Sequence, residues 1–177
     1  MSISEVVSVI SPPKLVVDPA SDATRVVVEA AIGAQLPDDL FDLSRTYGTD
    51  RFSNGAFNLM IGNPASDAYC EAVQRRNGII TGLKESEGKS FIAYDVFPKQ
   101  PGLLSLGTED NEDKLYWLTE DKPEEWPIMI LRRHGGAVDR FPGPLTSFLA
   151  GVFSGSLTPH PWPHWISDPG RVWKFVA

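Results

Sequence analysis

The stretch from Leu103 to Phe153 constrains the fold most, because it alternates short apolar runs with turns rich in acidic residues, glycine and proline. The apolar runs occupy residues 103–108, 114–119, 126–131 and 137–141. Short runs with this punctuation predict successive antiparallel strands. The run at 126–131 is apolar on both faces, which is typical of a central strand covered on each side.

A helix is predicted to close this stretch. Residues 145–153 place apolar side chains at i, i+3, i+4, i+7 and i+8, which gives a helix one apolar face. Pro144 suits its first turn, since the N–H that proline lacks would be unpaired there. Gly155 can end it in a left-handed cap. We expect this helix to pack on the sheet, because that packing removes five large side chains from water.

Three further helices are predicted upstream. Asp22 can cap a helix through Ile32, although residues 26–28 are three valines that suit a strand equally well. Residues 37–48 give a clearer helix, with proline at its start and glycine at its end. A third helix is expected to begin at Asn63-Pro64 and to end at Asn77-Gly78, with residues 79–83 either continuing it or forming a short strand.

The two ends of the chain differ from this core. Residues 1–20 hold two small apolar runs split by Pro12-Pro13, which fit either edge strands or a loosely held arm. Residues 157–177 interleave prolines with tryptophans and histidines, a pattern that forbids a regular helix and predicts an extended strap packed on the domain. We therefore expect one domain over residues 21–156, flanked by these two segments.

Composition and charge restrict the kind of ligand. At 177 residues the chain fits a single domain. A formal net charge of −7 argues against nucleic acid as the primary ligand and would attract a basic partner. The single cysteine, Cys70, excludes an internal disulfide and a multi-cysteine zinc site. Without a signal-like leader or a membrane-length apolar run, we expect a cytoplasmic protein with no membrane partner.

Two acidic turns flank the run at 114–119. Their eight carboxylates are Glu109, Asp110, Glu112, Asp113, Glu120, Asp121, Glu124 and Glu125. Lys114 and Lys122 are the only cations among them, so the net charge of residues 109–125 is −6. They are either solvated turns that keep the protein soluble or a docking surface for a basic partner such as a nuclease toxin. Calcium is disfavoured, because the spacing does not match an EF-hand loop.

Two further expectations concern this acidic segment. Turn residues at the same end of a sheet would lie close together, which favours the docking hypothesis over scattered charge. Trp126 is a candidate anchor for a partner if its ring is exposed at the start of its strand.

No constellation for catalysis or metal binding is present in the sequence. It has no G-x-S-x-G elbow, no G-x-G-x-x-G and no P-loop. His160 and His164 are four residues apart, but the prolines at 161 and 163 prevent the helix that would place them on one face. We therefore expect no metal, no cofactor and no enzymatic activity.

Several motifs, taken in order, resemble the SUKH superfamily of Smi/Knr-like proteins, in particular its bacterial immunity branch. The residues that carry the resemblance are Ile32-Gly33, Leu36 to Leu40, Tyr47-Gly48, Leu103 to Thr108, Asp110-Asn111, Asp113, Leu115 to Trp117, Trp126-Pro127 and the helix at 145–153. The resemblance covers roughly residues 25–155. Residues 1–20 and the tail after Leu157 go beyond it.

The resemblance implies a single α+β domain with a mainly antiparallel, mixed sheet of about five to six strands covered by helices. It also implies a non-enzymatic role, since the family has no catalytic motif. Bacterial members are commonly immunity proteins that bind and silence toxin domains of polymorphic toxin systems, and fungal relatives regulate cell-wall synthesis.

The leading functional expectation is therefore an immunity protein that binds and neutralises a cognate toxin. The alternative is a regulatory or ligand-binding module that recognises a glycan or peptide through the tail. In that case Trp162, Trp165 and Trp173 would form a stacking surface. Aromatic side chains that fasten a tail to the core are the commoner arrangement.

Overall fold

The computed structural model describes residues 3–49, 51–87, 92–133, 138–160, 162–167 and 170–176. Within those ranges the α-helices are α1 (Ile3–Val9), α2 (Asp22–Ile32), α3 (Asp38–Tyr47), α4 (Tyr69–Glu87) and α5 (Leu145–Ser154). The strands are β1 (Arg51–Ser53), β2 (Asn58–Ile61), β3 (Asp95–Val96), β4 (Gly102–Glu109), β5 (Lys114–Leu118), β6 (Ile128–Leu131), β7 (Val138–Phe141) and β8 (Lys174–Val176). Two 3₁₀ helices are also present, η1 (Pro123–Glu125) and η2 (His164–Ser167).

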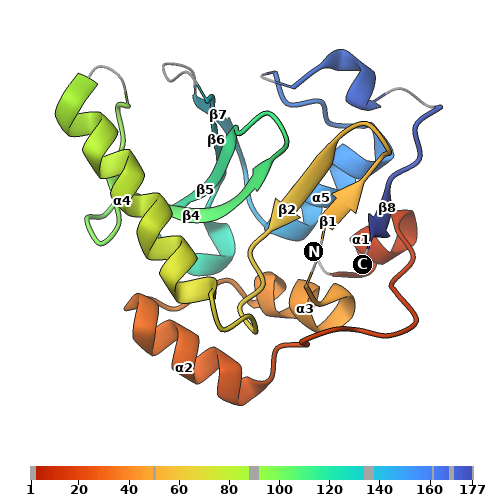
Figure 1. Ribbon diagram of the computed structural model, residues 1–177, viewed down its shortest axis with the longest axis horizontal. Coiled ribbons are helices and arrows are strands. Elements are labelled where there is room, and N and C mark those ends of the chain that lie inside the picture. Colours follow the sequence, from red (N-terminus) through yellow and green to blue (C-terminus); the bar gives the residue numbers. More distant parts are fainter. Residues whose placement is uncertain are drawn as a thin grey trace.

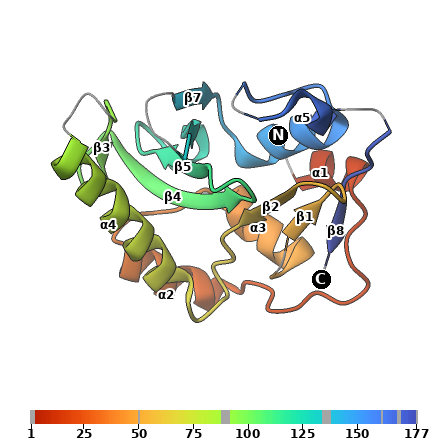
Figure 2. The ribbon, with the colours of Figure 1, turned by 45° about the horizontal axis from the view of Figure 1, so that its top comes forward.

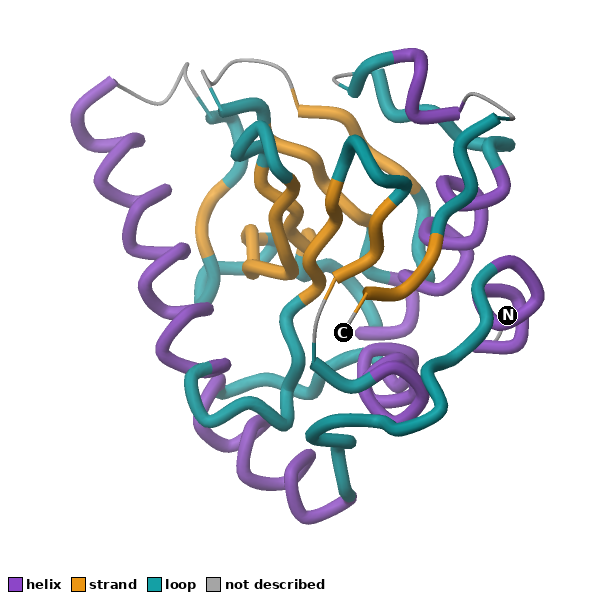
Figure 3. Tube along the Cα trace, turned by 45° about the vertical axis from the view of Figure 1, so that its right-hand side comes forward, coloured by secondary structure: helices purple, strands orange, loops and turns teal. Residues whose placement is uncertain are grey.

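The strands form one sheet, around which the helices are arranged (Figures 1 and 3). Its order is β7-β6-β5-β4-β2-β1-β8, and β3 adds to β4 in the sheet's one parallel pairing among the described residues. The expected α+β class with a mainly antiparallel, mixed sheet is confirmed. The described chain has eight strands rather than five to six. Residues 51–61 form a hairpin of two strands, and the tail adds β8 beside β1.

The central strands are buried on both faces of the sheet. Leu115 and Trp117 of β5 belong to the larger core with α1, α3 and α5, whereas Tyr116 belongs to a second cluster with Ile80 of α4. The four residues of β6 are all buried, as expected for a strand covered on each side. The part of α4 around Ile80 therefore lies on the opposite side of β5 from α5 (Figure 2), whereas Tyr69 and Val73 at the start of α4 join the larger core.

Helix α5 has the bounds and the buried face that its sequence predicts. Pro144 stands at its N-cap position, and Gly155 ends it in the left-handed region at φ 76°. Phe148 is only 3% exposed and packs against the ring of Phe141, with ring centroids 5.3 Å apart. The helix start is held by Asp39 of α3, whose Oδ2 accepts a hydrogen bond of 2.9 Å from the backbone N–H of Thr146.

Helix α4 begins at Tyr69 rather than at Asn63-Pro64 and does not end at Asn77-Gly78, so both predicted bounds are wrong. Residues 79–83 continue the helix, which was one of the two expectations for them, and it ends at Glu87. The continuation buries Ile80, which is 2% exposed in the second cluster. This burial outweighs the cost of a glycine inside a helix, which is about 1 kcal/mol. The Asn77 side chain does not cap the helix. Instead, it accepts a 3.1 Å hydrogen bond from the backbone N–H of Ser105 in β4.

The first residues form α1, which is neither an edge strand nor a loose arm. Val6 is fully buried, and Ser147 of α5 donates a 3.0 Å hydrogen bond to the carboxylate of Glu5. Tyr47 donates a 2.6 Å hydrogen bond to the carbonyl oxygen of Ile10. The N-terminal segment is thus part of the core of the domain.

The C-terminal segment also packs on the domain. Trp162 is 2% exposed and Trp173 is 4% exposed, and both rings lie within about 6 Å of the Phe57 ring. No helix in the described ranges is long and apolar enough to span a membrane.

Candidate functional site

The two acidic turns lie at opposite ends of β5. One joins β4 to the start of β5, and the other joins the end of β5 to β6. Each connection reverses the direction of the chain, because β5 pairs antiparallel with both neighbours. A five-residue strand separates its ends by about 16 Å at roughly 3.3 Å per residue. The expectation that the turns share one end of the sheet is therefore wrong. Their charge of −6 is divided between two sites.

In the first turn, two carboxylates hold the turn itself. Glu109 is 2% exposed, and its carboxylate accepts hydrogen bonds of 2.6 Å from the backbone N–H groups of Asn111 and Asp113. Burial raises the pKa of Glu109. Asp113 is 8% exposed and accepts a 2.9 Å hydrogen bond from the backbone N–H of Arg133. Both side chains serve the fold and are hidden from a partner.

The other two carboxylates of this turn have partners within the chain. Asp110 accepts hydrogen bonds of 2.8 Å from the backbone and side-chain nitrogens of Asn58. Glu112 forms an ion pair with Arg133, with Nε and Oε2 3.2 Å apart. The first turn therefore offers less free negative charge than its sequence suggests.

The second turn keeps more of its charge. Glu120 forms an ion pair with Arg140. Asp121, Glu124 and Glu125 are exposed, and within the described residues none of them forms an ion pair. Helix η1 carries the two glutamates, and Asp121 precedes it at φ 53°. We call these three side chains the acidic cluster.

Trp126 was a candidate anchor for a partner only if its ring was exposed, and the ring is buried. It is 4% exposed and packs against Trp117, with ring centroids 6.2 Å apart. It fixes the end of the second turn to the core.

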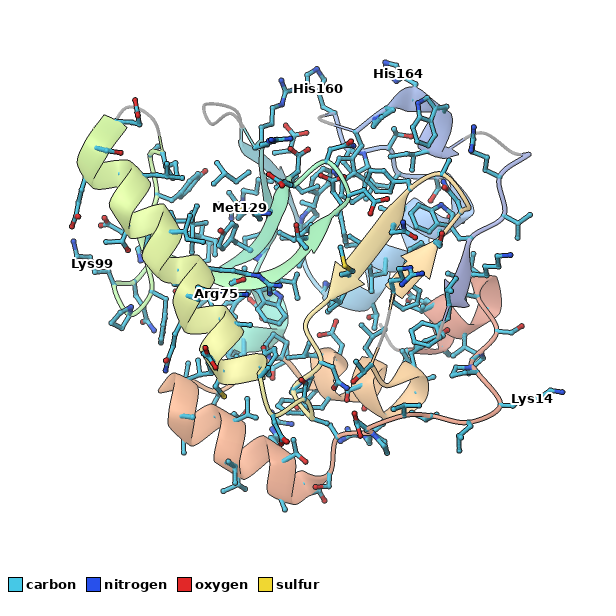
Figure 4. The ribbon with its side chains drawn as sticks, viewed as in Figure 1. Lys14, Arg75, Lys99, Met129, His160 and His164 are labelled. Carbon is cyan, nitrogen blue, oxygen red and sulfur yellow. The ribbon has the colours of Figure 1, made fainter. Side chains whose placement is uncertain are left out.

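The structure also shows a groove that the sequence did not predict, and we call it the α4 groove. It has a volume of about 350 Å³ and lies between α4 and the adjoining ends of β5 and β6. It is lined by Arg76, Ile79, Ile80, Leu83, Glu112, Lys114, Tyr116, Leu131, Arg132 and Arg133. Figure 4 shows Met129 between the strands and α4.

The sequence contains one signal for this groove, which is the helical spacing of four of its side chains, Arg76, Ile79, Ile80 and Leu83. It places the four side chains on one face of α4. The predicted helix end at Asn77 separated Arg76 from the other three. The strand residues of the groove lie far away in sequence, so no local spacing could have joined them to α4.

Two arginines in the groove have incomplete partners. Arg76 is half-buried, and burial lowers its pKa. Among the described residues no carboxylate pairs with it. Arg132 has its Nη2 2.7 Å from Nδ1 of His160, whereas its Nε is buried without a hydrogen-bond partner in the described part of the chain.

The remaining candidate side chains do not assemble into a chemical centre. Over the described ranges, no group of three or more His, Cys, Asp and Glu side chains is placed to hold a metal ion. In the tail, Trp162 and Trp173 are buried in the core. Trp165 is 40% exposed, and the guanidinium of Arg171 lies 4.7 Å from the centre of its ring. A stacking surface of all three tryptophans is therefore not formed.

Comparison of the chain with protein-family models, with curated proteins and with solved structures gave no match.

Proposed function

We propose that this protein is a non-enzymatic protein-binding module, and specifically an immunity protein that binds and neutralises a cognate toxin domain. The order of motifs that resembles the SUKH superfamily supports this proposal. The α+β sheet covered by helices is the architecture that the resemblance implies.

The observation that carries the proposal is the acidic cluster. Asp121, Glu124 and Glu125 present three exposed carboxylates without ion-pair partners in the described chain, on a short connection that the buried Trp126 fastens to the core. A fixed cluster of one sign attracts a partner of the opposite sign and speeds encounter. We therefore propose a basic toxin domain, such as a nuclease, as the partner.

Composition supports the same proposal. The net charge of −7 favours a basic protein over nucleic acid as the ligand. A single cysteine, partly buried and unpaired, fits a reducing compartment. We accordingly propose that the protein acts in the cytoplasm.

Co-expression with candidate toxin domains, taken from the reading frames adjacent to that of this protein, tests this function. The proposal predicts that cells survive and that the two proteins elute as one equimolar complex in gel filtration. It is wrong if the toxin still kills cells that contain the folded protein, and if the purified proteins remain separate at micromolar concentration.

A further inference from the structure

The α4 groove carries a local positive charge, although the net charge of the molecule is negative. It is lined by four cations, Arg76, Lys114, Arg132 and Arg133, and by one carboxylate, Glu112. The whole chain has 16 basic and 23 acidic residues. A local excess of cations on an acidic protein is a fixed positive field, and such a field favours an anionic ligand.

The donors of the groove are only partly used. Glu112 pairs with Arg133, and Lys114 donates a 3.2 Å hydrogen bond to the hydroxyl of Thr108. Arg76 has no carboxylate partner in the described chain, and the Nε of Arg132 is buried and unpaired there. A guanidinium that has no carboxylate partner keeps N–H donors for a ligand carboxylate. Guanidinium groups bind carboxylates through two parallel hydrogen bonds.

The side of the groove formed by α4 is apolar. Ile79 is 53% exposed, although isoleucine is among the residue types most often buried. Leu83 is half-buried one turn further along, and Tyr116 and Leu131 of the sheet lie beneath. A volume of about 350 Å³ falls in the range of ligand sites, roughly 300–1,000 Å³. An apolar ligand group would therefore cover Ile79 and Leu83 while its anionic neighbours meet the arginines.

We propose that the α4 groove binds an acidic peptide segment of a protein partner, in which carboxylates flank one large aliphatic or aromatic side chain. The apolar group would lie against Ile79 and Leu83, and the carboxylates would bind Arg76 and Arg132. This proposal goes beyond toxin neutralisation, because it uses a different surface and a partner of opposite charge.

The groove suits a peptide better than a nucleic acid or a membrane. Single-stranded nucleic acids are held by exposed aromatic rings, and the one ring here, Tyr116, is 1% exposed. A membrane surface requires a broad basic face on an amphipathic element, whereas α4 also carries Glu71, Glu85 and Glu87.

A random peptide library displayed on phage, selected against the immobilised full-length protein, provides the probe. We expect the selected sequences to combine Asp or Glu with a large apolar residue. A synthetic peptide of the selected sequence should bind Arg76→Glu and Ile79→Glu at least about tenfold more weakly than the parent, a change of about 1.4 kcal/mol. Ile79 is exposed, so its substitution keeps the test valid if Arg76→Glu fails to fold.

Two matched controls make the same chemical changes away from the groove. Lys14→Glu reverses an exposed cation on the far side of the molecule from α4 (Figure 4). Val26→Glu places a charge on a 69% exposed apolar residue of α2. Both should bind the peptide as the parent does.

Several outcomes would overturn the proposal. They are selection of basic or uncharged sequences, no selection at all, and equal binding by the groove variants and the controls. Sedimentation with phosphatidylglycerol vesicles, or binding of a single-stranded oligonucleotide, that is lost in Arg76→Glu would assign the groove to phosphate instead.

Discussion

Glu109 and Asp39 are carboxylates that the fold buries to hold backbone N–H groups. Glu109 binds two such groups within its own turn, and Asp39 binds the one at Thr146. In a sequence, a carboxylate of this type cannot be distinguished from an exposed one. It is buried by the geometry of its own turn or by a helix that is distant in sequence. The four acidic residues among positions 109–113 could not be divided into structural and exposed carboxylates from composition alone.

Replacing Glu109 with glutamine should destabilise the protein. A glutamine has one carbonyl oxygen, so one of the two backbone N–H groups loses its acceptor and faces an amide NH₂ group. We expect the unfolding free energy to fall by about 1–3 kcal/mol in urea denaturation at neutral pH. The exposed Glu125→Gln should change it by no more than about 0.5 kcal/mol. Equal stability of the two variants would show that Glu109 does not hold the turn.

Asp39 should make stability depend on pH. Burial raises the pKa of Asp39, although the Thr146 N–H opposes this, so the folded protein holds the proton more tightly than the unfolded chain. Its contribution to stability is full below the ordinary carboxyl pKa of about 4 and is lost as the pH rises through the raised value.

Asp39→Asn tests this dependence because an amide does not titrate. Between about pH 4 and pH 7 the unfolding free energy of this variant should decline less than that of the parent. The exposed Asp67→Asn should follow the parent. If the profiles of Asp39→Asn and the parent run parallel, the ionisation of Asp39 is not linked to folding.

The bounds of a helix or strand could be predicted where the residues that determine them lie close together in the sequence. The apolar periodicity, Pro144 and Gly155 all lie within or beside α5, so its bounds followed from the sequence. The end of α4 did not, because Asn77-Gly78 is a good stop signal that only the burial of Ile80 against the sheet overrides. The strand β8 was missed because its partner β1 lies more than a hundred residues away.

Phe148→Ala tests the packing of α5 on the sheet. Phe148 is 3% exposed between the rings of Phe141 and Trp162. Truncating a buried aromatic side chain leaves a cavity, so the unfolding free energy should fall by about 3–5 kcal/mol. A loss below about 1 kcal/mol in chemical denaturation would place this side chain outside the core.

Gly78→Ala distinguishes the continuous α4 from the predicted helix end. A Cβ at Gly78 would meet no atom within 4 Å, and its φ lies outside the left-handed region. Alanine should therefore raise the unfolding free energy by about 0.4–1 kcal/mol. A helix that ended here in a left-handed cap would be destabilised by the same substitution, and a lowered melting temperature would reveal it.

The sheet topology determines where the charged side chains lie on the molecule. The two acidic turns lie at opposite ends of β5, and cations from α4, from β5 and from the residues after β6 line one groove. Charge counts along the sequence cannot show either effect, since both depend on which strands pair. The α+β class and the composition of the turns were predictable, whereas the arrangement of the surfaces was not.

The association rate with the toxin domain shows whether the acidic cluster attracts the partner. The triple variant Asp121→Lys, Glu124→Lys and Glu125→Lys reverses the acidic cluster. Its control, Glu71→Lys, Glu85→Lys and Glu87→Lys, changes the net charge equally at exposed positions of α4. The parent should associate faster than the roughly 10⁵–10⁶ M⁻¹s⁻¹ of an unsteered pair, and added salt should slow it.

Stopped-flow measurements at low and high salt give the result. We predict that the cluster variant associates slowly and with little salt dependence, while the control keeps most of the rate of the parent, because steering depends on charge near the binding face. Exposed pairs are individually worth only about 0–1 kcal/mol, so dissociation should change little. Equal association rates and equal salt dependence for the cluster variant and the control would contradict docking of the toxin at the acidic cluster.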